Sequence, residues 1–262
     1  IRFLTNDAGL EIWPSFSPDG GKVAFAKDKD LFWLNLANNR VARLTRRENE
    51  LIYNGVPDWV YDEEFALRRA FWWSPNSDQL AFLQFDTSPI TTFPIADNLE
   101  RIPTVEQQQY PKAGDPNAIV RAGVINIGNG GITWINMDRD SDSYIPRVGW
   151  LPDGSRVWLQ WVDRDQTTID LLFANPQTGT VNLILQEKDD AWIDVRNDFR
   201  FIDERRFIWM SERSGWRHLY IYGIDGVLER QLTDGEWQVE NVGGFDSNYE
   251  FIYFTATEAS PL

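Results

Sequence analysis

The chain has 262 residues, of which 40 are Asp or Glu, 25 are Lys or Arg and one is His, so its formal net charge at pH 7 is −15. This surplus of acids disfavours nucleic acids and anionic membrane surfaces as partners, because both require a surface rich in Lys and Arg. Cys is absent, which excludes a disulfide framework, a Cys-based zinc site and a thiol nucleophile, and no apolar run approaches the roughly 18 residues of a membrane span.

A short turn motif recurs along the chain. Its clearest copies are Ser17-Pro18-Asp19-Gly20, Ser74-Pro75-Asn76 and Leu151-Pro152-Asp153-Gly154, and weaker copies occur within 199–209 and 242–254. Pro presets φ, Asp or Asn accepts local backbone hydrogen bonds, and Gly tolerates positive φ. Aromatic and β-branched runs flank each copy, as is typical of strands joined by a tight turn.

Two more strand-like runs follow most of these hairpins, so that four strands repeat at intervals of about 40–50 residues, which indicates a β-propeller. The sequence therefore predicts an all-β fold, a β-propeller of four-stranded blades with a short helical insertion. A β-sandwich also accounts for many strands, but it does not account for the recurring turn. We expect residues 1–262 to form part of a propeller whose last blade is incomplete, with blades at about 12–45, 69–136, 145–186, 198–233 and 239–262.

Six tryptophans lie beside the turn motifs, and we expect them to pack between blade faces, where large rings bury much surface. They are Trp72, Trp73, Trp150, Trp158, Trp161 and Trp209.

Residues 46–68 interrupt the repeat as an acidic insertion. Gly55 and Pro57 indicate a turn, after which Asp58 can cap a short helix over 59–66. Two adjacent carboxylates, those of Glu63 and Glu64, then stand on a projecting segment. One interpretation is a cation site, because an ammonium group has three donors and suits two carboxylates. The alternatives are a solvated acidic helix face, or an acidic run that pairs with Arg68 and Arg69 a turn later.

Residues 87–118 form a second insertion, inside the second predicted blade. It contains five prolines, which predict an extended arm. Such an arm is either a plain surface loop or a contact with a partner or another subunit.

Four segments, taken in chain order, resemble the propeller of the dipeptidyl peptidase IV family. They are Asp58–Phe65, Phe71–Asn76, Tyr110–Gly114 and Ser211–Tyr220. The resemblance implies a serine exopeptidase with an N-terminal eight-bladed propeller and a C-terminal α/β-hydrolase domain, which removes X-Pro dipeptides from the amino termini of peptides. It also implies that Glu63 and Glu64 hold the free amino terminus of the substrate, and that the arm at 87–118 helps to form a homodimer.

The resemblance also sets expectations for the whole protein. We expect the chain to be a piece of a longer protein, because the family's first blades have no counterpart here, and neither does an arginine that the family uses near the substrate carbonyl. The missing Cys residues and glycosylation sites favour a bacterial source, with a periplasmic, secreted or cell-surface location; a cytoplasmic location stays an alternative.

Catalytic groups are not expected in this chain. It has no Gly-x-Ser-x-Gly nucleophile motif, and its single histidine, His218, starts a predicted strand, where a structural role is expected. We predict no catalytic residue, no cofactor and no metal site, and hence an inactive fragment of an active parent. The alternative function is a non-enzymatic binding propeller like the TolB-type repeats, but such a scaffold has no need for the Glu63-Glu64 insertion.

Overall fold

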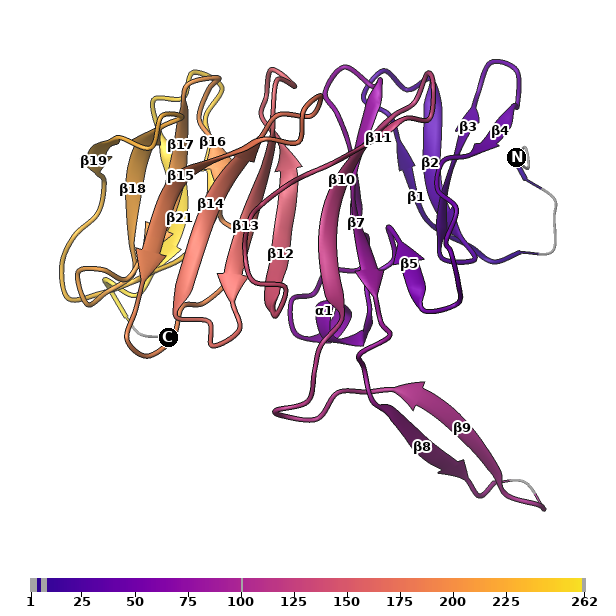
Figure 1. Cartoon of the computed structure of the whole chain (residues 1–262). Coiled ribbons are helices and arrows are strands. Elements are labelled where there is room, and N and C mark those ends of the chain that lie inside the picture. Colours follow the sequence, from indigo (N-terminus) through magenta and orange to yellow (C-terminus); the bar gives the residue numbers. More distant parts are fainter. Residues whose placement is uncertain (1–3, 6–8, 100, 261–262) are drawn as a thin grey trace.

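The chain forms a series of antiparallel β-sheets that stand side by side in sequence order (Figure 1). This computed structural model describes residues 4–5, 9–99 and 101–260. The first sheet contains β1 (Glu11–Phe16), β2 (Lys22–Lys27), β3 (Asp30–Asn35) and β4 (Val41–Arg43). The third contains β12 (Ser143–Trp150), β13 (Val157–Asp163), β14 (Thr168–Ala174) and β15 (Val181–Lys188). The fourth contains β16 (Arg200–Phe201), β17 (Arg206–Ser211), β18 (His218–Gly223) and β19 (Leu228–Gln231), and the last only β20 (Val239–Phe245) and β21 (Ile252–Ala256).

The second sheet has a divided first strand. Its members are β5 (Ile52–Asn54), β6 (Phe71–Trp73), β7 (Gln79–Asp86), β10 (Ile119–Asn126) and β11 (Ile132–Trp134). Both β5 and β6 pair with β7, β5 with residues 84–86 and β6 with residues 80–82. The chain between them contains the one helix of the described residues, α1 (Trp59–Glu63). The structure thus places β5, which the sequence analysis assigned to the insertion at 46–68, in the sheet itself.

The arm is a two-stranded hairpin that projects from the second sheet (Figure 1). It consists of β8 (Thr92–Asp97) and β9 (Thr104–Gln109), which pair from Thr92 opposite Gln109 to Asp97 opposite Thr104. The prolines predicted an extended arm, and the sequence analysis gave it no strand pairing. The structure shows extended backbone that pairs with itself.

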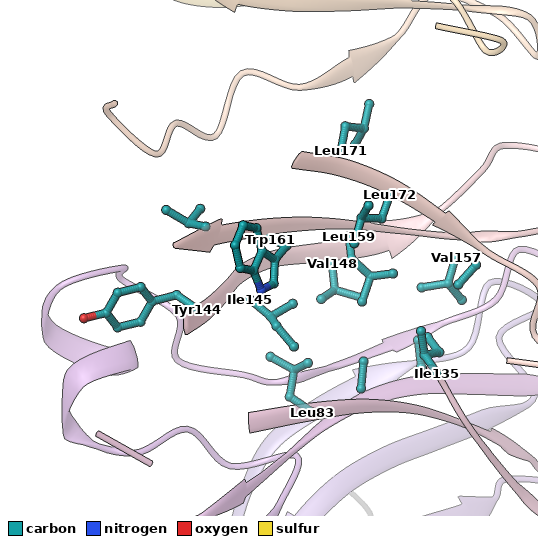
Figure 2. Packing of buried hydrophobic residues seen from close by; sticks show 14 of the residues in the cluster. Leu83, Ile135, Tyr144, Ile145, Val148, Val157, Leu159, Trp161, Leu171 and Leu172 are labelled. Carbon is teal, nitrogen blue, oxygen red and sulfur yellow. The ribbon is translucent and has the colours of Figure 1, made fainter. Parts of the chain in front are cut away.

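Successive sheets share apolar cores. One cluster joins the first and second sheets, a second and larger cluster runs through the second, third and fourth, and a third joins the fourth and the last. Figure 2 shows part of the large cluster, where Leu83 of β7 lies across from Ile145 and Val148 of β12. Stacking of four-stranded sheets through their faces confirms the predicted all-β, propeller-like fold.

The indole N–H groups of three tryptophans also link neighbouring sheets by hydrogen bonds. The Trp73 Nε1 donates to the Ser15 carbonyl of the first sheet (3.0 Å), and the Trp150 Nε1 of the third sheet donates to the Trp72 carbonyl (3.0 Å). The Trp209 Nε1 of the fourth sheet donates to Glu187 of the third (2.6 Å). Trp73, Trp150 and Trp209 therefore connect neighbouring blades, as predicted, whereas the Trp161 Nε1 donates to Ser143 of its own sheet (2.8 Å).

Candidate functional site at the α1 insertion

The start of α1 is fixed by Asp58. Its backbone is extended (φ −78°, ψ −179°), and its carboxylate accepts a hydrogen bond from the Tyr61 backbone N–H at 3.0 Å. This is the usual arrangement of an N-cap, which satisfies one of the free N–H groups of the first helical turn. Asp58 is only 5% exposed, and its Oδ2 atom has no hydrogen-bond partner among the described residues. Because burial outweighs the hydrogen bond from Tyr61, the pKa of Asp58 rises to about 6.

The end of α1 is a tight turn. Glu64 is the C-cap, Ala66 takes a left-handed φ of 51°, and the Leu67 N–H donates back to the Tyr61 carbonyl at 2.9 Å. The helix is therefore shorter than the predicted 59–66. A left-handed residue cannot continue an α-helix, and this property of Ala66 has no signal in the sequence.

One face of the insertion is buried in the large core. Tyr61 is 1% exposed, and its ring packs edge-on against Phe85 (4.9 Å between centroids) and against Phe65 (5.4 Å). Its hydroxyl accepts a hydrogen bond from the Ile145 N–H of β12 at 2.8 Å. The helix is thus held both by apolar packing and by a polar contact with the next sheet.

The opposite face carries Glu63 and Glu64, both exposed. Neither carboxylate has a hydrogen bond or an ion pair with any other residue that the structure describes. The arginines that follow do not pair with these two glutamates: Arg68 lies 3.6 Å from Asp62, the acid that precedes them, and Arg69 lies over the Phe71 ring. For Glu63 and Glu64 the alternative that stays open is a solvated helix face. The structure therefore presents two adjacent carboxylates to solvent from a fixed backbone.

The base of the arm lies against the same insertion. The Trp59 and Tyr110 rings are 4.4 Å apart, and the Tyr53 hydroxyl donates to the Gln109 side chain at 3.0 Å. Lys112 lies over the Phe93 ring at 4.8 Å. Two segments that carry the family resemblance, 58–65 and 110–114, are thus in contact although 44 residues separate them.

A pocket between the third and fourth sheets was missed by the sequence analysis, which assigned no role to residues 192–201. The residues that line it include five acids, two arginines and an exposed indole: Glu187, Asp189, Asp194, Asp198, Glu212, Arg196, Arg217 and Trp192. β15 ends opposite the start of β14, and β12 starts at the same end of the third sheet, where Ile145 contacts Tyr61 of α1. The pocket therefore lies at the end of the third sheet that faces α1. The only feature of the sequence that could have indicated this pocket is the group of acids around Trp192.

His218 is a structural residue. It is 1% exposed, and its Nε2 lies 3.0 Å from the Gly235 carbonyl, which can only accept, so this nitrogen carries the proton. Its Nδ1 lies 3.0 Å from the Thr233 hydroxyl. Both ring nitrogens are therefore used in holding the loop that follows β19.

The fold and these insertions define a part of a β-propeller that carries an acidic helix and a projecting hairpin on one blade. A family model described as the dipeptidyl peptidase IV (DPP IV) N-terminal region matches residues 1–262. The chain belongs to this family. Within the described residues, no helix has the length and apolar character needed to cross a membrane.

Relatives of known name agree with this assignment. The chain is 32% identical over 269 residues to dipeptidyl peptidase 4 of Trichophyton rubrum and 31% identical over 273 residues to that of Arthroderma otae. Each match covers 97% of this chain. The crystal structure of Porphyromonas gingivalis dipeptidyl peptidase 4 is similar with a TM-score of 0.93 and 28% identity over 98% of this chain and 37% of that one. The chain spans about a third of the length of these curated relatives. They are fungal and the structure is bacterial, so the source of this chain stays a prediction.

Proposed function

We propose that this chain is the substrate-gating and amino-terminus-recognising propeller domain of a serine dipeptidyl peptidase that removes X-Pro dipeptides from peptide amino termini. The family assignment and the names of the relatives support a peptidase parent. The observation that carries the recognition role is the Glu63-Glu64 pair, which is exposed and unpaired among the described residues while the backbone beneath it is buried and hydrogen-bonded.

Two carboxylates on a fixed turn suit an ammonium group. The ammonium has three N–H donors and no acceptor, and charge-assisted hydrogen bonds to carboxylates are roughly twice as strong as neutral ones. A free amino terminus carries this group, whereas an internal stretch of peptide does not. Binding at Glu63 and Glu64 therefore places the scissile bond at a set distance from the amino end, which gives release of a dipeptide.

The other parts of the reaction belong to the rest of the protein. A C-terminal α/β-hydrolase domain supplies the nucleophile, and the propeller limits access to it, so that only thin, unfolded amino termini reach the nucleophile. The arm contributes to a homodimer, and the protein acts in the periplasm, at the cell surface or outside a bacterial cell. A TolB-like propeller without an enzyme would share the blades but leave α1 without a role.

Conservative variants of the full-length protein test this proposal. Glu63→Gln and Glu64→Gln keep the shape and remove the charge, which leaves the substrate cation short of a partner at a loss of about 2–5 kcal/mol. With about 1.4 kcal/mol per tenfold, kcat/KM for a free-amine X-Pro substrate should fall at least about 30-fold in each variant. An N-acetylated substrate, already poor, should be barely affected.

The control is the thermal midpoint, which should hardly change because both side chains are exposed. If both variants cleave the free-amine substrate at the rate of the unaltered protein, the acidic pair is a solvated helix face and the recognition role is wrong.

A further inference from the structure

We propose that Arg147, together with a bulge in β12, positions the Glu63-Glu64 pair from the neighbouring sheet. The inference rests on the function proposed above and adds a residue that the sequence analysis did not single out. Arg147 is a positioning residue, because it acts on the backbone that carries the two glutamates rather than on the substrate.

The bulge frees a backbone donor. In the β12–β13 pair, Tyr144 lies opposite Val162 and Arg147 opposite Gln160, so residues 145 and 146 face Trp161 alone. Pro146 has no N–H to leave unpaired at this point, which makes a bulge a suitable place for it. The Ile145 N–H is thus released from the ladder and donates instead to the Tyr61 hydroxyl.

Arg147 makes the second contact. Its Nη1 atom donates to the Phe65 carbonyl at 2.9 Å and to the Pro146 carbonyl at 2.8 Å. Its Nε atom is buried without a hydrogen-bond partner, and no ion pair of Arg147 occurs among the described residues. Desolvation by burial lowers the pKa of Arg147. This partly buried arginine donates only to carbonyls, and it lies just past the carboxyl end of α1, where a cation is favourable.

The two contacts bracket the glutamates. Tyr61 lies two residues before Glu63, and Phe65 directly follows Glu64, so both ends of the turn are tied to residues 145–147. The Phe65 and Tyr144 rings also pack edge-on at 5.1 Å, and Figure 2 shows Tyr144 reaching from β12 toward α1. A turn fixed in this way loses less conformational freedom when a ligand binds, which favours binding.

The test uses kinetics of the full-length protein. Arg147→Ala should lower kcat/KM for a free-amine X-Pro substrate by about tenfold to 100-fold, mainly through a higher KM. The reason is that the turn no longer holds the two carboxylates in position for the substrate ammonium. Arg147→Lys keeps a charged donor and should recover part of this loss. Arg156→Ala is the matched control and should behave like the unaltered protein, because Arg156 is an exposed residue in the turn between β12 and β13, at the end of the sheet away from α1.

A double-variant cycle separates positioning from general damage. In the Glu63→Gln/Glu64→Gln background, Arg147→Ala should change kcat/KM less than about threefold, since it acts through the pair. The rate of labelling by a fluorophosphonate, a reagent without an amine, should be unchanged in every variant. If Arg147→Ala does not fold, Tyr61→Phe, which removes one hydroxyl, replaces it under the same criteria.

The outcomes are distinct. Normal kinetics of Arg147→Ala beside impaired glutamine variants overturn this inference and leave the proposed function intact. An equal loss in the glutamine background, or slowed labelling, makes Arg147 a structural residue and also overturns it. If the glutamine variants themselves are normal, the proposed function fails and this inference fails with it.

Discussion

Asp58 links the start of α1 to pH. Its folded-state pKa of about 6 lies above the value of 3.8 expected in an unfolded chain, and the cause is burial. The native state therefore binds a proton more tightly than the unfolded state. The resulting stabilisation is fully present below about pH 4 and is lost as the pH rises through about 6, at about 1.4 kcal/mol per unit of pKa difference.

Asp58→Asn should remove this pH dependence, because the amide oxygen can still cap the Tyr61 N–H while the group no longer ionises. The free energy of unfolding of the variant minus that of the unaltered chain should rise by about 2–3 kcal/mol between pH 4 and pH 8. Urea titrations across this range measure the difference. A difference that stays flat with pH would show that the carboxylate is not desolvated as the structure indicates.

Single residues also mark what the sequence leaves open. The pattern at 58–65 predicts a capped helix with two acids on it, and the structure has both. It does not predict that Ala66 has a left-handed backbone conformation or that Arg68 pairs with Asp62. Nor does it predict that Arg147, more than eighty residues away in the sequence, donates to the Phe65 carbonyl. These depend on the relative placement of two sheets, which no local pattern encodes.

At the scale of elements, the arm is an isolated hairpin with apolar side chains in solvent. Phe93, Ile95 and Val105 are 39%, 43% and 58% exposed. A two-stranded hairpin is marginally stable alone in water, and exposed apolar groups of this kind are typical of interaction surfaces. This supports the proposed role of the arm in a dimer.

Removal of the arm tip from the full-length protein should give a monomer. The strand register allows residues 95–106 to be replaced by an Asn-Gly turn between Pro94 and Gln107, which face each other. Val105→Glu should weaken the dimer in the same direction, while Thr104→Glu, at an exposed polar position beside it, is the control. Light scattering gives the mass of each. A dimer that survives both changes would make the arm a plain surface hairpin.

The elements were predictable to different degrees. The Pro-Asp-Gly turns mark the hairpins correctly, and Gly20 and Gly154 have the positive φ values (68° and 72°) that such turns need. In the second copy Ser77 takes this role with φ 63°, which the motif does not foretell. The three-residue strand β5 was assigned to an insertion because its membership of the sheet depends on pairing with β7, whose partner residues lie 30 to 34 positions further along.

At the scale of the whole molecule, the chain carries the proposed recognition groups Glu63 and Glu64, and its sequence has no Gly-x-Ser-x-Gly motif. The purified 262-residue chain should therefore not hydrolyse an X-Pro chromogenic dipeptide, while the full-length protein should. The assay compares both at equal molar concentration after removal of contaminating peptidases. Turnover that stays with the purified 262-residue chain would contradict the division of labour proposed between propeller and hydrolase domain.

The proposed recognition of the amino terminus is tested most directly by calorimetric titration. The titration compares the affinity of the full-length protein for an X-Pro dipeptide with a free amino group and for the same dipeptide with an acetylated one. The dipeptide is not cleaved during the titration, so the comparison isolates binding of the ammonium group. We predict that the free dipeptide binds at least about 30-fold more tightly than the acetylated one, and that Glu63→Gln and Glu64→Gln each remove most of this preference. Equal affinity for the two dipeptides, or a preference that persists in both variants, would contradict the account.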